Sequence, residues 1–166
     1  MIEPEMESGI RRLLAHAGDC VWRKDLEGYG QCWASDGAWK LLGMTAHGRE
    51  AIKAMWWQQM APFDHVWHVA QNVNLAADGD EAIARLYLEE TLQITGGGVA
   101  AVRGIYHDRY KREDGRWVFA RRHFDLIYSG PADMSGRFFP AIDYGPGPAD
   151  PDPARPATPS AAELFG

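Results

Sequence analysis

The chain has 166 residues, 46% of them hydrophobic and 24% charged, so it is long enough to bury one hydrophobic core. Its 17 basic and 23 acidic residues give a formal net charge of −6, which argues against nucleic acid or an anionic membrane as a partner. No apolar run is long enough to predict a membrane-spanning helix, and two cysteines are too few for a disulfide framework, so we expect a cytoplasmic protein.

Helical periodicity predicts three helices at the start of the chain. Apolar residues three and four positions apart predict a helix over 5–22, and a shorter helix is expected over 25–34. After a turn and a short strand at 38–42, a third helix is expected over 48–60, where Pro62 ends it.

Four long strands are predicted after the helices, over 64–76, 82–95, 99–112 and 116–128. Asp-Gly turns join the first pair and the last pair of strands, and three glycines join the middle pair. Hairpins behind an all-helical start predict an α+β fold in which three N-terminal helices pack on an antiparallel sheet. Because the strands are longer than usual, we expect the sheet to curve strongly around a cavity.

The composition changes near residue 129, after the predicted sheet. Eight of the ten prolines follow that point, and proline is excluded from helix interiors and central strands. We therefore predict one domain over 1–144 and a Pro-rich extended tail over 145–166.

One predicted strand carries a carboxylate on an otherwise apolar face. The even positions of 82–94 are apolar except for Glu90. Because a buried carboxylate is costly unless it is paired, Glu90 is either partnered in a salt bridge or functional.

The strand over 64–76 contains two histidines that cannot form a metal pair. His65 and His68 are three residues apart, so they point to opposite faces of the strand. We expect His68 to share its face with Val66, and Trp67 to lie on the apolar face. No group of His, Cys and Asp residues shows ligand spacing, so no metal site is predicted.

The strand over 116–128 changes its apolar positions from odd to even. This change predicts a β-bulge near 120–122. Beyond the bulge, His123 and Asp125 share one face, either as an oriented pair or as a surface contact. Leu126 and Tyr128 share the opposite face.

Several short phrases occur in a fixed order along residues 8–128. They are Asp36-Gly37-Ala38-Trp39, Gly48-Arg49-Glu50-Ala51-Ile52, His68 followed by Asn72, Asp78-Gly79-Asp80, Tyr87-Leu88-Glu89-Glu90, and Gly104 to Tyr110 running into Asp114 to Trp117. Together they resemble the SnoaL-like branch of the nuclear transport factor 2-like superfamily. The branch includes scytalone-type dehydratases and a hexachlorocyclohexane dehydrochlorinase. The resemblance implies a cone-shaped α+β barrel and acid–base chemistry without a cofactor in a deep apolar cavity.

The resemblance also implies site residues. In the lyases of this branch, a strand histidine removes a proton from carbon, helped by an aspartate and often a tyrosine on the first helix. His68 matches the histidine, whereas the aspartate and tyrosine positions fall on Trp22 and Ala17. Either Asp19 or Asp25 replaces the missing aspartate, or the histidine–aspartate pair is absent.

We predict a cofactor-free lyase of aromatic compound catabolism, which removes water or, by retro-aldol cleavage, formaldehyde from a hydrophobic small molecule. His68 is the expected base, because its unperturbed pKa lies near neutral pH. The further catalytic candidates are Tyr106, Glu90, His123 and Asp125. Seven tryptophans favour an apolar pocket, and the substrate-binding candidates are Trp22, Trp39, Trp56, Met60, Arg103, Leu126 and Tyr128.

Two other function classes stay open at this point. A non-catalytic module of the same fold would use the cone as an assembly platform, with Trp22 filling a dead pocket. An isomerase or epoxide hydrolase would use the same cavity, with Arg103 and Asp125 as polar groups. Apolar rows on both faces of the predicted sheet also favour a homodimer, and no nucleic acid or membrane partner is expected.

Overall fold

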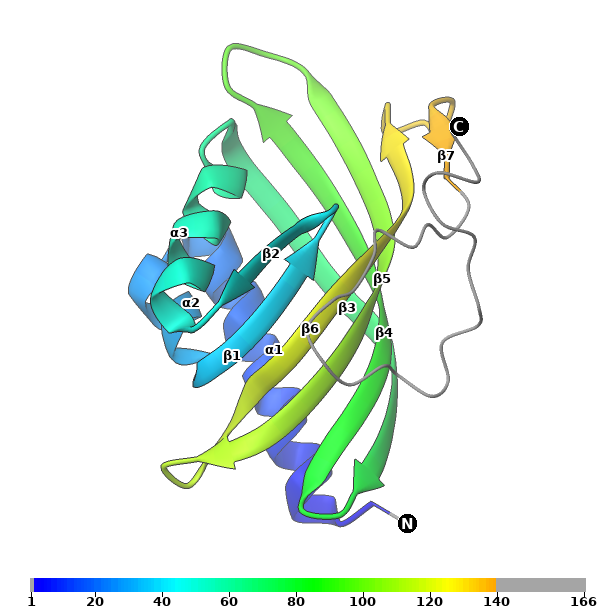
Figure 1. Cartoon of the computed structure of the whole chain (residues 1–166). Helices are drawn as coiled ribbons and strands as arrows, with labels where there is room; N and C mark the ends of the chain where they lie inside the picture. Colours follow the sequence, from blue (N-terminus) through cyan, green and yellow to red (C-terminus); the bar gives the residue numbers. More distant parts are fainter. Residues whose placement is uncertain (1, 140–166) are drawn as a thin grey trace.

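The computed structural model describes residues 2–139, in which helices pack on one side of a curved sheet (Figure 1). The helices are α1 (Pro4–Arg23), α2 (Leu26–Gln31) and α3 (Arg49–Met60). The strands are β1 (Trp33–Leu41), β2 (Met44–His47), β3 (Phe63–Asp78), β4 (Glu81–Ile94), β5 (Val99–Glu113), β6 (Arg116–Gly130) and β7 (Arg137–Phe138). The strand order is β2-β1-β6-β5-β4-β3, and β7 pairs with β6.

These elements confirm the predicted α+β fold. They depart from the prediction in the segment between the start of the second helix and the third helix. The second helix ends at Gln31 because Trp33 already pairs with Phe119 of β6. The strand predicted over 38–42 therefore starts earlier, and it pairs with β6 in parallel. The sheet, predicted to be antiparallel, therefore contains one parallel pair, β1 with β6. The Pro-rich segment predicted over 145–166 lies outside the described residues.

An extra residue interrupts the pairing of β3 with β4. Gln71 pairs with Tyr87 and Asn74 pairs with Arg85, so two residues of β3 lie opposite one residue of β4. Asn72 has a φ of 53°, in the left-handed region that asparagine tolerates better than most residues. This arrangement is a β-bulge, which bends the strand and changes the alternation of its side chains.

The bulge determines which face of β3 is buried. In the part of β3 that precedes the bulge, Val66 is buried, and it lines a cavity together with His68. Beyond the bulge, Val73 and Leu75 pack against the same core. Trp67, expected on the apolar face, is 59% exposed. That expectation is wrong because it assumed unbroken alternation along the strand.

A second bulge lies in β6, where the sequence predicted one. Arg109 pairs with Arg121, and the next residue Tyr110 pairs with Phe119, which leaves Ala120 as the extra residue. Such an extra residue increases the local bend of a strand. It explains why the apolar positions of this strand change from odd to even.

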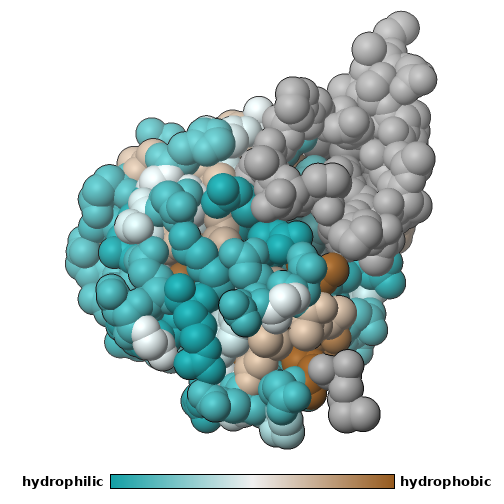
Figure 2. Space-filling model, turned by 60° about the horizontal axis from the view of Figure 1, so that its bottom comes forward, coloured by the Kyte–Doolittle hydropathy of each residue, from teal (hydrophilic) through white to brown (hydrophobic). Residues whose placement is uncertain are grey.

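The hydrophobic core fills the space between the helices and the concave face of the sheet. Ile10 of α1, Ile52 of α3 and Leu86 of β4 are fully buried within it. On the face shown in Figure 2, hydrophilic residues predominate and the apolar residues gather near one edge. In the described part of the chain, no helix is long and apolar enough to cross a membrane.

Candidate active site

A cavity of about 200 Å³ lies between the helices and the concave face of the sheet. Apolar side chains make up most of its wall, and they include Trp39, Trp56, Met60, Leu88, Phe124 and Leu126. Groups with proton chemistry also line it, namely His68, Glu90 and the two phenols of Tyr29 and Tyr106. The cavity therefore combines an apolar environment with few polar groups, as binding sites for small molecules usually do.

His68 and Glu90 form a hydrogen-bonded pair across neighbouring strands. They lie directly opposite each other in the β3–β4 register, and Nδ1 of His68 is 2.7 Å from Oε1 of Glu90. An ionised carboxylate only accepts hydrogen bonds, so Nδ1 donates and Nε2 carries the lone pair. Within residues 2–139, Nε2 of His68 has no hydrogen-bond partner. The pair is therefore arranged as a base with its orienting carboxylate.

Tyr106 of β5 adds a phenol to the same cavity. Its ring packs against Phe124 with ring centroids 4.9 Å apart. Burial raises the pKa of the Tyr106 phenol well above its ordinary range, although the Arg122 guanidinium opposes the shift. The phenol consequently keeps its proton at neutral pH and can donate a hydrogen bond.

A buried ion pair fixes the position of the Tyr106 ring. The Nε and Nη2 atoms of Arg122 each donate to one oxygen of Asp108 at 2.7 Å, and the hydroxyl of Tyr110 also donates to Asp108. The Arg122 guanidinium lies 4.0 Å from the Tyr106 ring centroid and 3.9 Å from that of Phe119. This cation–π stacking leaves Tyr106 little freedom to turn away from the cavity.

Aromatic residues from three elements form another part of the cavity wall. Tyr29 of α2 stacks on Trp56 of α3 at 4.5 Å between ring centroids, and Trp39 of β1 lies 6.2 Å from the same tyrosine. The indole Nε1 of Trp39 is buried and has no hydrogen-bond partner within the described residues. A buried N–H normally finds a partner, so Trp39 offers a donor that an oxygen of a bound molecule could satisfy.

The two aspartates proposed as replacements on the first helix do not contact His68. Asp19 and Asp25 both form ion pairs with Arg23, at 2.8 and 3.3 Å. Asp25 also caps α2, because its carboxylate accepts a hydrogen bond from the backbone N–H of Gly28. Asp19 and His68 border the same open groove along α1, but the groove does not bring the two side chains into hydrogen-bond contact.

His123 and Asp125 lie on the convex face of the sheet, away from the cavity. Their neighbour Phe124 faces the cavity, and alternate residues of a strand face opposite sides. Nε2 of His107 forms a hydrogen bond of 3.0 Å with Asp125, whose other oxygen lies 3.4 Å from Nε2 of His123. His123 and Asp125 thus lie close together, and the hydrogen bond of Asp125 at 3.0 Å is to His107, which the sequence did not reveal.

The seven substrate-binding candidates divide into two groups. Trp39, Trp56, Met60 and Leu126 line the cavity. The other three, Trp22, Arg103 and Tyr128, are not among its lining residues.

These three residues have other contacts. Trp22 is 47% exposed and stacks on His65. Arg103 donates a hydrogen bond to the backbone oxygen of Glu90. The Tyr128 hydroxyl donates to the backbone oxygen of Pro131 at 2.6 Å.

Sequence reasoning missed Tyr29 and Arg122 as parts of the site. Arg122 stands two positions before Phe124, so strand alternation already placed it on the cavity side. The helix prediction around Tyr29 gave no sign of its stacking on Trp56, because that contact joins two separate helices.

A curved sheet that encloses an apolar cavity with a histidine–carboxylate pair defines a cone-shaped α+β protein of the nuclear transport factor 2-like class. The chain belongs to the family of SnoaL-like domains, whose model matches residues 3–123. A search of curated protein sequences finds no match.

Solved structures share the fold at low sequence identity. A candidate scytalone dehydratase from Novosphingobium aromaticivorans is 19% identical with a TM-score of 0.71, over 78% of this chain and 89% of that one. The hexachlorocyclohexane dehydrochlorinase LinA-type3 from Novosphingobium barchaimii is 20% identical with a TM-score of 0.68, over 80% and 92%. Rv3472 from Mycobacterium tuberculosis, of unknown function, is 26% identical with a TM-score of 0.68, over 75% and 77%.

Proposed function

We propose that this protein is a cofactor-independent lyase that acts on a hydrophobic, aromatic small molecule by general acid–base chemistry. The observation that carries the proposal is the hydrogen bond between His68 and Glu90 at the wall of an apolar cavity. The likeness of the fold to a dehydrochlorinase supports the same class of reaction. A positioned acid or base contributes about 10²–10⁴-fold to a rate.

Elimination of water is the first reaction that these groups suit. Nε2 of His68 takes a proton from a carbon, and the released electron pair forms the new C=C bond while the C–O bond breaks. Glu90 stabilises the imidazolium that forms, as the carboxylate of a catalytic triad does. The leaving oxygen receives a proton from the imidazolium and departs as water. Alternatively, Tyr106 donates this proton, and the imidazolium then returns a proton to the phenolate.

Retro-aldol loss of formaldehyde needs the same groups in a different order. Nε2 of His68 takes the proton of a hydroxymethyl group, the C–O bond becomes a carbonyl, and the C–C bond breaks. The electron pair of that bond stays on the aromatic fragment as a carbanion, which then takes a proton from the imidazolium. Aromatic cavity walls at Trp39 and Trp56 suit a flat substrate in either reaction.

The experiment is an assay without added cofactor or metal. Purified protein is incubated with a panel of β-hydroxy aromatic and hydroxymethyl diaryl compounds, and mass spectrometry follows loss of water or formaldehyde. We expect His68→Ala to lower turnover by at least about 10²-fold. The matched control is His65→Ala, because His65 is an exposed histidine of the same strand.

Two outcomes would contradict the proposal. Turnover that survives His68→Ala would assign the chemistry to another group. No turnover by the wild type, together with no rise in melting temperature with any compound, would favour the non-catalytic module.

A further inference from the structure

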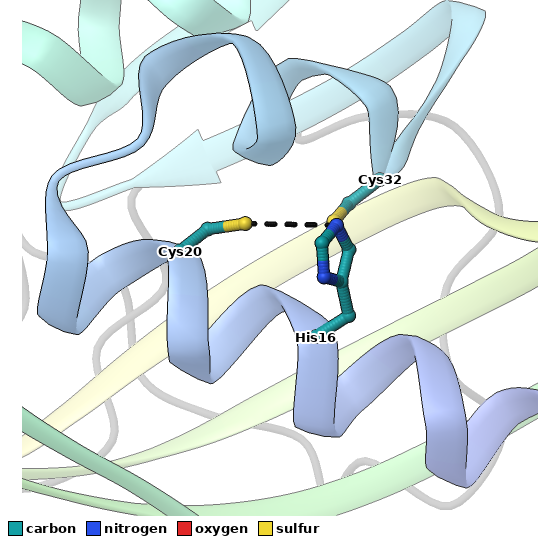
Figure 3. Close-up of side chains that lie close together, drawn as sticks. All are labelled: His16, Cys20 and Cys32. Atoms are coloured by element: carbon teal, nitrogen blue, oxygen red, sulfur yellow. Dashed lines mark hydrogen bonds between the residues drawn. The ribbon is translucent and has the colours of Figure 1, made fainter.

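Three side chains of types that bind metals lie together outside the cavity that His68 and Glu90 line. His16 and Cys20 are one turn apart on α1, and Cys32 directly follows α2 (Figure 3). Their ligand atoms all lie within 4.8 Å of one another, and Nε2 of His16 is 3.7 Å from Sγ of Cys20. The cluster joins two segments of chain that the fold brings together.

We propose that His16, Cys20 and Cys32 bind a zinc-type divalent cation through two thiolates and one imidazole. Thiolate sulfur and imidazole nitrogen are the ligands that Zn²⁺ prefers in proteins. The charges of two thiolates cancel those of the cation, so the filled site is neutral. A neutral site suits this position, because both sulfur atoms belong to buried residues.

The distances are close to those of a tetrahedral site. Zn–S and Zn–N bonds of about 2.3 and 2.0–2.1 Å place two sulfurs about 3.8 Å apart, and a sulfur and a nitrogen about 3.5 Å apart. The observed separation of 3.7 Å between His16 and Cys20 already fits. No separation exceeds 4.8 Å, so none must shorten by more than about 1 Å, which rotation of the cysteine side chains can provide.

The backbone between the two helices holds Cys32 against α1. Lys24 ends α1 with a φ of 53°, and the Asp25 side chain caps α2. The Cys32 thiol donates to the backbone oxygen of Gly28 at 3.4 Å. These contacts position the ligands before a cation binds, so binding requires little ordering of the chain.

Burial keeps the two thiols protonated in the absence of a cation. It raises the pKa of Cys32 to about 12 and raises that of Cys20 as well. A cation reverses this preference, because coordination takes place through the thiolate and releases the proton.

A second cavity gives the site access to solvent. His16 and Cys32 line it together with Arg12 and Gln31, and its volume is about 310 Å³. It lies apart from the cavity that contains His68, and the two cavities share no lining residue. A cation can enter from this side, and a water molecule can complete the fourth position.

Cobalt provides the test, because thiolate-bound Co²⁺ absorbs in the near ultraviolet through sulfur-to-metal charge transfer. The full chain, with its thiols reduced and the reductant removed, is titrated with Co²⁺ and then with Zn²⁺. We expect one equivalent of Co²⁺ to produce the band and Zn²⁺ to abolish it. We also expect Zn²⁺ to raise the melting temperature.

Matched variants assign the ligands. His16→Gln should weaken Co²⁺ binding about tenfold or more. Loss of a residue that only hydrogen-bonds to a metal ligand already lowers metal affinity by about 10–100-fold. His16 is exposed, so this variant keeps its core intact, and His47→Gln is the control because His47 is another exposed histidine. Cys20→Ala with Cys32→Ala should remove the charge-transfer band.

The proposal is overturned if the reduced wild type gives no charge-transfer band. It is also overturned if His16→Gln binds Co²⁺ as tightly as His47→Gln does. Lyase turnover is a separate readout, so failure of the metal site and failure of the proposed function are distinguishable.

Discussion

Two histidine–carboxylate groups lie on opposite faces of one sheet. On the concave face, His68 donates to Glu90 at 2.7 Å. On the convex face, Asp125 divides its oxygens between His107 at 3.0 Å and His123 at 3.4 Å. Both groups connect neighbouring strands, yet only the residues of the first group line the apolar cavity described above.

A histidine–carboxylate contact can act on a bound molecule only where it lines a cavity, so its surroundings determine its role. His68 has one carboxylate partner and lines the cavity together with it. Asp125 is 4% exposed and lies between two imidazoles on the far side of the sheet. We therefore expect the first group to contribute to turnover and the second to contribute to stability.

The largest expected effect is a difference in turnover between variants of the two carboxylates, Glu90 and Asp125. Glu90→Gln removes the charge that stabilises the imidazolium, and we expect kcat to fall by about 10²–10⁴-fold. Asp125→Asn, the matched amide on the convex face, should leave kcat within about twofold. Steady-state kinetics on the substrate found by mass spectrometry measures both. Equal losses in the two variants would remove the distinction between the faces.

The next effect is on stability, where we expect Asp125→Asn to cause a larger loss than Glu90→Gln. Asp125→Asn disrupts the buried hydrogen bond to His107, and we expect the free energy of unfolding to fall by about 1–3 kcal/mol. Glu90→Gln keeps an acceptor beside His68 and should cost less than about 1 kcal/mol. Urea unfolding followed by circular dichroism gives both values. A larger loss for Glu90→Gln would show that the concave pair is structural.

The smallest effect concerns the Tyr106 phenol, one of the two phenols that line the cavity. Tyr106→Phe removes one hydrogen-bond donor, and we expect kcat to fall about tenfold. Because burial raises the pKa of Tyr106, the phenol stays protonated as pH rises to its ordinary pKa. The alkaline side of the pH–rate profile should therefore have the same shape in the variant and the wild type. Tyr87→Phe, an exposed tyrosine of β4, is the control.

Most of the fold could be predicted from the sequence because its local signals are strong. The helix expected over 5–22 and the four long strands match the observed elements to within about three residues at each end. Their apolar periodicity and Asp-Gly turns act within short segments. The second helix was predicted too long, because its end depends on the pairing of Trp33 with a strand far along the chain.

The site was predicted only in part, because its pairings depend on tertiary structure. Strand alternation singled out Glu90, but it did not show that Glu90 lies opposite His68. Likewise, no metal site was predicted, because the position of Cys32 beside His16 and Cys20 requires the turn between two helices. Local patterns therefore identified candidate residues and not their partners.

The bulge at Asn72 has a consequence for comparing related sequences. If β3 paired regularly with β4 from the hairpin turn onward, His68 would lie opposite Thr91 instead of Glu90. Partners in a sheet share a face, so the imidazole would then point to the convex side. A relative with a regular strand must place its histidine one residue nearer the turn to form the same pair. A one-residue gap in an alignment at this point would therefore mark the same active-site geometry and not its loss.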